Sequence, residues 1–289
     1  MPGDLHTHTT FSDGSLPVQA LPALAKRAGL NWLAVSDHDT LRSVRYAYDH
    51  PNEDGVALIP ATELTAYDFE RGRQVHILCY WPDADCPRLA AHCQLMARRR
   101  NQVCTQSARE LEQLYPQFRL QDALRLAGAG GVLYKSTLMQ VLYQYGLADG
   151  IYQQDYKALF GAKGGKVLHN PRYEPVDTVL QTIRAARGVA VFAHPSTYNS
   201  MELVRQLAAQ GRIDGVEVEH PRNTPQDKQE LRRLAQQYGL LTTGGTDFHG
   251  MNTATPRPLG LCRSTEEQID RLNRLAAARK RSTKEEEVL

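Results

Sequence analysis

The strongest restriction on the fold of this chain is the repeated placement of histidine and acidic residues within or beside short apolar runs. The first run, Asp4-Leu5-His6-Thr7-His8, is typical of a strand. Residues two apart on a strand point to the same face, so His6 and His8 can bind one ion. The other side chains in the pattern are Asp13, His38, Glu63, His76, His194, Asp247 and His249.

Strand-like runs alternate with helical stretches over much of the chain. The strand-like runs lie at 32–36, 189–193, 215–219 and 240–243, and the helical stretches at 16–28, 176–187, 201–210 and 227–238. This β-α-β rhythm predicts an α/β protein with a parallel sheet and helices outside it. Most of the candidate ligands fall at the carboxyl ends of the predicted strands, where a (β/α) barrel places its active site.

The rhythm breaks between residues 84 and 170, where no clear strand occurs. Apolar residues from Leu89 to Leu114 fit a long amphipathic helix, and two or three shorter helices can follow. We interpret this region as an inserted helical cap on a barrel formed by residues 1–83 and 171–278. Residues 279–289 are predicted to form a charged, frayed tail.

Composition narrows the classes of function and the compartment. The chain has 289 residues and a net charge of +2, so no global field marks a protein that binds nucleic acid or a membrane surface. Its five cysteines form no Cys-x-x-Cys pair, which argues against a disulfide framework or a thiolate zinc site. No leader or membrane-spanning run is evident. We therefore expect a soluble protein of the reducing cytoplasm, with no membrane contact and no obligate protein partner.

The number of imidazole and carboxylate groups points to bound metal. A single histidine beside an apolar run is more often structural, but nine such groups would be costly to gather without cations. Histidine with carboxylate and no cysteine suits Zn²⁺, Mn²⁺ or Fe²⁺ better than Mg²⁺ or Ca²⁺. One ion cannot take nine ligands, so we expect two or three divalent ions.

These segments resemble the motifs of the polymerase and histidinol phosphatase (PHP) family. The resemblance lies in Asp4–His8, Ser36-Asp37-His38-Asp39, Glu63, His76, Ala193-His194-Pro195 and Thr246-Asp247-Phe248-His249. It implies a distorted (β/α)₇ barrel with up to three metal ions. The implied ligands are His6, His8, Glu63 and Asp247 for the first ion, Glu63, His76 and His194 for the second, and Asp13, His38 and His249 for the third.

Such a centre favours hydrolysis of an anionic substrate. Three divalent ions against three carboxylates leave a charge of about +3, which suits a phosphate ester. A metal-bound hydroxide would then act as the nucleophile. Asp37 and Asp39 flank His38 and are predicted to orient imidazoles or handle protons. Capping of the following helix is an equally good interpretation of both.

The inserted region resembles that of nucleoside 3',5'-bisphosphate phosphatases and related 5'-to-3' RNA exonucleases. Those proteins usually carry Arg-Pro-His or Arg-Thr-His where this chain has Lys135-Ser136-Thr137. Lysine keeps the charge but loses the bidentate fork for phosphate. The predicted substrate contacts are Lys135, Ser136, His220 and Arg257, for which a solvated or structural role is the alternative.

The leading hypothesis is therefore a metal-dependent phosphatase of a small nucleotide, best a nucleoside 3',5'-bisphosphate. A 5'-to-3' exonuclease on short RNA would use the same chemistry, with strong salt dependence. An amidohydrolase-type enzyme is a further alternative, because metal-activated water also attacks carbonyl carbon. A non-catalytic module that supports a partner protein is the last alternative, although the set of ligands looks intact.

Overall fold

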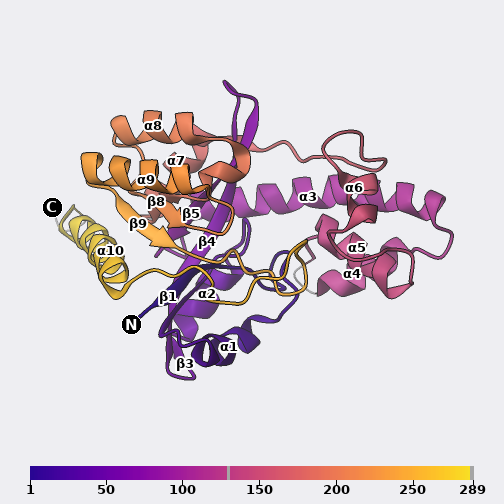
Figure 1. The fold of residues 1–289 in the computed structure, drawn as a ribbon, viewed down its shortest axis with the longest axis horizontal. Helices are drawn as coiled ribbons and strands as arrows, with labels where there is room; N and C mark the ends of the chain where they lie inside the picture. Colours follow the sequence, from indigo (N-terminus) through magenta and orange to yellow (C-terminus); the bar gives the residue numbers. More distant parts are fainter. Residues whose placement is uncertain (129–130, 287–289) are drawn as a thin grey trace.

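The computed structural model describes residues 1–128 and 131–286, which form a mixed α/β body with a group of helices extending from one side (Figure 1). The strands are β1 (Gly3–Thr7), β2 (Trp32–Val35), β3 (Asn52–Glu53), β4 (Val56–Asp68), β5 (Arg73–Tyr80), β6 (Glu174–Pro175), β7 (Val189–Phe192), β8 (Gly215–Glu219) and β9 (Leu241–Gly244). The α-helices are α1 (Leu21–Arg27), α2 (Arg42–Asp49), α3 (Pro87–Leu114), α4 (Leu120–Ala127), α5 (Lys135–Gln144), α6 (Gln154–Phe160), α7 (Val176–Ala185), α8 (Met201–Ala209), α9 (Pro225–Tyr238) and α10 (Glu266–Glu286). Short 3₁₀ helices lie at Val18–Ala20 and Pro195–Tyr198.

The sheet curls into a nearly closed barrel. Its strand order is β1-β2-β4-β5-β7-β8-β9, and the short β3 and β6 add to β4. The two ends of this order meet because Asp247, just past β9, donates its backbone N–H to the carbonyl of His6 on β1 at 2.9 Å. The backbone N–H of His8 in turn donates a hydrogen bond to the carbonyl of Phe248 at 2.8 Å. The predicted distorted (β/α)₇ barrel is confirmed.

The prediction of a parallel sheet is wrong at β5, which runs antiparallel to both β4 and β7. Only a tight turn separates Asp68 from Arg73, and a turn of this length can only join antiparallel strands. The register pairs Thr65 with His76, so His76 is a diagonal neighbour of Glu63 on the same face of the hairpin. The antiparallel β5 therefore brings the carboxylate of Glu63 and the imidazole of His76 together.

The region predicted as a cap contains α3 to α6 and has a core of its own. Helix α3 starts against the barrel, where Leu89 packs in the barrel core, and its far half carries α4, α5 and α6 (Figure 1). That second core includes Phe118, Leu138 and Leu142, all fully buried. A core separate from the apolar clusters of the barrel agrees with the predicted insertion, whose limits at residues 84 and 170 stay a prediction.

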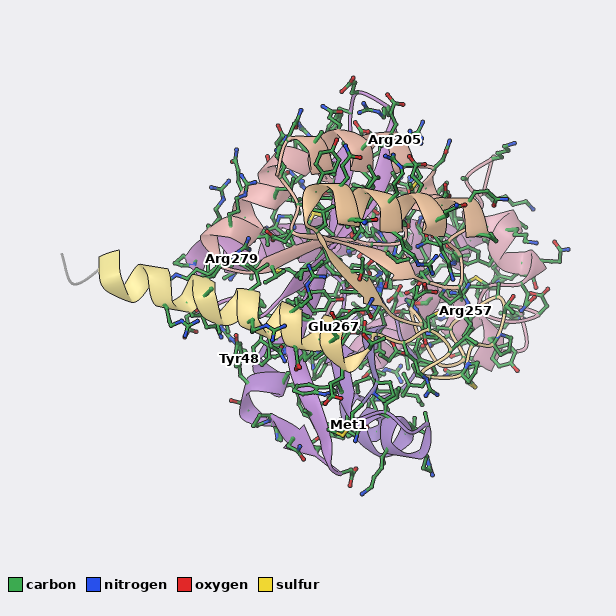
Figure 2. All side chains as sticks on the ribbon, turned by 60° about the vertical axis from the view of Figure 1, so that its left-hand side comes forward. Met1, Tyr48, Arg205, Arg257, Glu267 and Arg279 are labelled. Carbon is green, nitrogen blue, oxygen red and sulfur yellow. The ribbon has the colours of Figure 1, made fainter. Side chains whose placement is uncertain are left out.

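The C-terminal helix packs on the barrel and continues into the predicted tail. Ile269 and Leu272 of α10 are fully buried in the barrel core. Arg279 binds Asp214 and the carbonyl of Gly188, so this part of the charged segment is tied to the barrel (Figure 2). The chain is helical as far as Glu286, and residues 287–289 lie outside the described residues. Within the described ranges, no helix combines the length and apolar character that a membrane span requires.

Candidate metal centre

Glu63 of β4 is the centre of the first ligand group. Its Oε2 lies 3.3 Å from the Nε2 atoms of both His6 and His8 on β1. Asp247, directly after β9, places Oδ1 3.3 Å from the Nε2 of His8 and 3.7 Å from that of His6. All four side chains are buried. The two histidines share one face of β1 because they are two residues apart, as the sequence predicted.

The other oxygen of Glu63 faces the second group. Its Oε1 lies 2.8 Å from the Nδ1 of His76 on β5 and 3.0 Å from the Nε2 of His194, which follows β7. One carboxylate therefore lies between two sets of imidazoles, the arrangement of a bridging ligand. His194 has a φ of +25°, a backbone conformation unusual for a side chain of this size.

A third group surrounds Asp13, in the loop after β1. The Nε2 of His249 lies 3.3 Å from Oδ1 of Asp13, and the Nε2 of His38 lies 3.9 Å from Oδ2. His8 completes a group of four whose ligand atoms are within 4.8 Å of one another. The Nδ1 of His38 also lies 3.1 Å from Glu63, so His38 stands between this group and Glu63. The structure thus brings all nine predicted ligands together.

Unpaired buried atoms in the cluster fit cations. Atoms that are buried without a hydrogen-bond partner include His6 Nε2, both ring nitrogens of His8, His38 Nδ1 and Glu63 Oε2. Buried polar atoms left unpaired are costly, and a divalent ion would satisfy both imidazole nitrogen and carboxylate oxygen at once. The donor set is nitrogen and oxygen, as suits Zn²⁺, Mn²⁺ or Fe²⁺. The identity and number of the ions stay predictions.

Burial and the carboxylates of the cluster also shift the pKa values of its imidazoles. Burial disfavours the charged form of His8, but the carboxylates of Asp247 and Glu63, each 3.3 Å from its Nε2, outweigh it and raise its pKa to about 10. Burial dominates at His38 and lowers its pKa to about 3, despite the nearby carboxylates. His38 therefore presents neutral nitrogens, whereas a metal ion must displace a proton from His8.

Asp37 and Asp39 have different partners from those predicted. Asp37 accepts hydrogen bonds from the backbone N–H of Thr9 at 2.8 Å and from its hydroxyl at 2.7 Å, so it supports the loop that carries Asp13 rather than an imidazole ligand. The capping interpretation is wrong for both acids, because Leu41 is the N-cap residue of α2 and no side chain caps that helix.

Asp39 connects the barrel to the cap. Its Oδ2 forms an ion pair with Arg100 of α3 at 2.5 Å, and its Oδ1 lies 3.4 Å from the Nε2 of His92 on the same helix. Arg100 also donates to the hydroxyl of Thr65 on β4 at 3.0 Å. Asp39 therefore orients groups of α3 and no predicted metal ligand.

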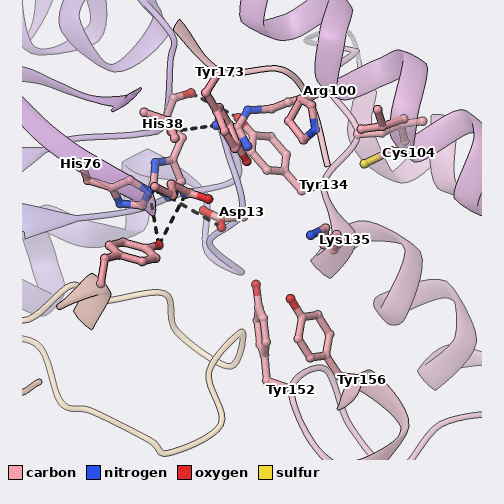
Figure 3. Close-up of a pocket in the computed structure, with 16 residues that line it drawn as sticks. Asp13, His38, His76, Arg100, Cys104, Tyr134, Lys135, Tyr152, Tyr156 and Tyr173 are labelled. Atoms are coloured by element: carbon pink, nitrogen blue, oxygen red, sulfur yellow. Dashed lines mark hydrogen bonds and ion pairs between the residues drawn. The ribbon is translucent and has the colours of Figure 1, made fainter. Parts of the chain in front are cut away.

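Two adjoining cavities, of about 220 and 280 Å³, lie against the ligand cluster. They share walls formed by Asp13, His38, His76, Tyr152, Tyr156 and Tyr198. Figure 3 shows the rings of Tyr152 and Tyr156 directed from the cap into this space, with Lys135 beside them. Lys135 lines the cap-side cavity, and its Nζ donates to Asn170 at 2.9 Å. Burial lowers the pKa of its amine.

The other predicted substrate contacts lie further from this space. Ser136 is buried and hydrogen bonds with Tyr152 inside the cap. His220 is fully buried, with its Nε2 3.5 Å from Asp247. Arg257 places a guanidinium nitrogen 3.9 Å from the same carboxylate. The structure therefore places His220 and Arg257 behind or beside a predicted metal ligand.

Sequence reasoning missed two charged residues of this region. Arg100 is the last residue of the run Arg98-Arg99-Arg100, and such a run is more often an exposed face of a helix. It lies four residues from the buried Met96 and Cys104, so helical spacing could have placed it on the apolar face. Glu217 lies between two valines of β8 and is fully buried beside His6. Its position in a buried strand was the available signal.

The comparisons with known proteins agree with this geometry. The PHP domain matches residues 4–144. The chain is 34% identical to a phosphoribosyl 1,2-cyclic phosphate 1,2-diphosphodiesterase of Eggerthella lenta, over 86% of this chain and 94% of that protein. It is 31% identical to the 5'-3' exoribonuclease Rnm of Escherichia coli (85% and 84%) and 27% identical to a 3',5'-nucleoside bisphosphate phosphatase of Chromobacterium violaceum (85% and 86%).

A solved structure from Bifidobacterium adolescentis, assigned as a metal-dependent phosphoesterase, superposes with a TM-score of 0.84 at 26% identity. The superposition covers 94% of this chain and 96% of that one, so the likeness extends over barrel and cap together.

Proposed function

Because the chain belongs to the PHP family and is a metal-dependent phosphoesterase, we propose that it removes phosphate from a small nucleotide, with a nucleoside 3',5'-bisphosphate as the first candidate. The observation that carries this proposal is the convergence of eight imidazole and carboxylate side chains around Glu63, open to the two cavities. The similar proteins are named as a phosphodiesterase, an exoribonuclease and a phosphatase, so a phosphate ester is a better candidate substrate than the carbonyl substrate of an amidohydrolase-type enzyme.

The proposed ligands divide as the three groups do. Glu63 would bridge the ions held by His6, His8 and Asp247 and by His76 and His194, with Asp13, His38 and His249 at the third position. Bound divalent ions supply an activated water and offset the negative charge that develops on a phosphoryl group.

The residues of the chain then select and orient the substrate. Lys135 offers an ammonium group for a second phosphate, at the cap end of the cavity. The rings of Tyr152 and Tyr156, with centroids 4.6 Å apart, offer apolar faces for a base or a sugar. Tyr198 places its hydroxyl 3.4 Å from the Nε2 of His76, at the junction of the two cavities. Cavities of this size favour a small substrate over a long polymer.

Two other substrates are favoured by particular relatives. The 34% identical protein is named for a phosphoribosyl 1,2-cyclic phosphate, and the 31% identical protein is named an exoribonuclease. Both reactions use the same metal chemistry on a phosphodiester, so the substrate panel must contain them.

The test is release of product in the presence of Mn²⁺ from nucleoside 3',5'-bisphosphates, nucleoside monophosphates, phosphoribosyl 1,2-cyclic phosphate and short RNA. We expect the highest kcat/KM for a bisphosphate. If mononucleotide release from RNA has the highest kcat/KM, RNA is the substrate in place of the bisphosphate. If opening of the cyclic ester has the highest kcat/KM, phosphoribosyl 1,2-cyclic phosphate is the substrate. Absence of turnover on every phosphate ester, in protein loaded with metal, would refute the proposal.

The role of Lys135 is tested in the same assay. Lys135→Ala should raise KM about tenfold or more for the bisphosphate and change KM for the monophosphate much less, because a charge-assisted contact is lost only with the second phosphate. Lys157→Ala, at an exposed position of α6, is the matched control. Equal effects of Lys135→Ala on both substrates would contradict this role.

A further inference from the structure

We infer that Glu217 is a positioning residue that holds ligands of two different metal ions in their binding geometry. The inference rests on the metal centre of the proposed function. Glu217 lies on β8, is fully buried, and binds with both carboxylate oxygens. Its Oε1 lies 2.9 Å from the Nδ1 of His6, and its Oε2 accepts the backbone N–H of His194 at 3.0 Å.

The contact with His6 decides which ring nitrogen carries the hydrogen. An ionised carboxylate only accepts, so the Nδ1 of His6 donates to Glu217. In the neutral ring the lone pair is then on Nε2, which faces Glu63 at 3.3 Å and Asp247 at 3.7 Å. This is the tautomer that a cation among these three groups requires.

The contact with His194 acts on the backbone. His194 has φ +25° and ψ +61° immediately after β7, a conformation that its surroundings must hold in place. The hydrogen bond from its N–H to Glu217 ties this turn to β8. The imidazole is then directed at Glu63, with Nε2 3.0 Å from Oε1. One carboxylate thus orients a ligand on each side of the bridging acid.

Glu217 could also be considered a ligand, because its oxygens, His6 and His194 are close enough to hold an ion. Both of its oxygens already accept a hydrogen, and the His6 nitrogen that faces Glu63 and Asp247 is the other one. The geometry therefore favours an acceptor role over direct coordination.

Glu217→Gln separates these roles with little change of shape. The amide keeps one acceptor and replaces the other by an NH₂ donor. If the NH₂ faces His194, two donors oppose each other. If it faces His6, Nδ1 must accept and the hydrogen moves to Nε2, where it blocks a metal ion. Glu219→Gln is the matched control, because Glu219 lies on the same strand but pairs with Lys228 and Arg232 near the surface.

The experiment is a titration of chelator-stripped full-length protein with Zn²⁺ and with Mn²⁺, followed by calorimetry. We expect Glu217→Gln to bind metal about 10- to 100-fold more weakly than wild type, with the same number of ions at saturation. Glu219→Gln should match wild type. Unchanged affinity in Glu217→Gln would overturn the inference, and so would loss of one whole equivalent that excess metal does not restore.

A second readout follows the hydrogen itself. In the zinc-loaded protein labelled with ¹⁵N-histidine, a low-field Nδ1–H signal of His6 should be present in wild type and Glu219→Gln, and in Glu217→Gln it should move upfield or be lost because no carboxylate accepts it. If Glu217→Gln does not fold, Glu217→Asp, which keeps both acceptors on a shorter side chain, takes its place and should recover part of the affinity. Metal binding without turnover in wild type would refute the proposed function and leave this inference standing.

Discussion

At the scale of single residues, Glu63 organises the site. Its carboxylate is fully buried, and its contacts with His6, His8, His76 and His194 range from 2.8 to 3.3 Å. Burial raises the pKa of a carboxyl group, but the surrounding imidazoles more than compensate and hold the pKa of Glu63 well below its usual range. The acid therefore remains ionised, as the proposed bridge between two ions requires.

Replacement of one ligand should remove both metal and activity. His6→Ala should lower metal content and reduce phosphate release by more than about 100-fold, because it removes a nitrogen that no neighbour can supply. Metal analysis and a phosphate-release assay check this expectation. His50→Ala is the control, because His50 is exposed and its Nδ1 lies 3.0 Å from the carbonyl of Tyr46 in the preceding helix α2. Full activity in His6→Ala would argue against ligation by the β1 histidines.

At the scale of elements, the long helix α3 connects the cap to the rim of the barrel. Arg100 of α3 reaches Asp39, which follows β2, and its guanidinium group lies 5.2 Å from the ring of Tyr134. Both partners of the ion pair are largely buried. The pair therefore couples the position of the cap, which carries Lys135, to the loop that carries His38.

Removal of this arginine should destabilise the protein. Arg100→Met leaves the Asp39 carboxylate buried without its cation, which costs about 3–5 kcal/mol of the free energy of unfolding. Urea unfolding at neutral pH measures the loss. Arg98→Met, an exposed neighbour on the same helix, should cost less than about 0.5 kcal/mol. Equal effects would show that the ion pair has no special role.

The effect of Arg100→Met should also depend on pH. Burial raises the pKa of Asp39, but Arg100 outweighs it, so the pKa lies below the usual range. A lowered pKa in the folded state stabilises the protein above the pKa of the unfolded chain, about 4, and this stability is lost as pH falls. The difference in unfolding free energy between wild type and Arg100→Met should therefore be constant from pH 6 to 8 and shrink below pH 4. A difference that grows in acid would contradict the ion pair.

At the scale of the whole molecule, the barrel and the cap each contribute one wall of the two cavities. The barrel core lies under the ligand cluster, and the cap core lies around Phe118 between α3, α4 and α5. The cavities lie between them, with ligands from the barrel on one wall and Tyr152, Tyr156 and Lys135 from the cap on the other. We therefore expect substrate selection to depend on the cap and metal binding to depend on the barrel.

A cavity in the cap core should test this division. Phe118→Ala removes a fully buried ring and should cost about 3–5 kcal/mol. If the cap core is independent, KM should rise while the number of bound ions stays that of wild type. Phe69→Ala, at an exposed position, is the control. Loss of metal from folded Phe118→Ala protein would show that the two cores are not separable.

Removal of metal should lower the stability of the whole barrel. Ions that bind the folded state stabilise it by mass action, by about 2.7 kcal/mol for a site at 100 times its dissociation constant. Treatment with a chelator should therefore lower the thermal midpoint, and added Zn²⁺ or Mn²⁺ should restore it. An unchanged midpoint after complete chelation would argue against binding at this centre.

Much of the site could be predicted from local spacing. The two-residue period of β1 predicts that His6 and His8 share a face, and the strands β2, β7, β8 and β9 lie close to the predicted runs because buried strands and their helices leave regular apolar patterns. The long insert was recognised as helical for the same reason. A sequence determines such periods by itself, since they depend on neighbours a few residues apart.

Only the tertiary structure decided which side chains meet. The tight turn before Arg73 makes β5 antiparallel to β4. Arg100 belongs to a basic run in the sequence, but in the structure it forms an ion pair with Asp39. Glu217 lies against His6, which is more than 200 residues away in the sequence. Period and composition show which face of an element is buried, but a buried polar group is satisfied by a partner from another element. That partner depends on barrel closure and on the packing of the cap.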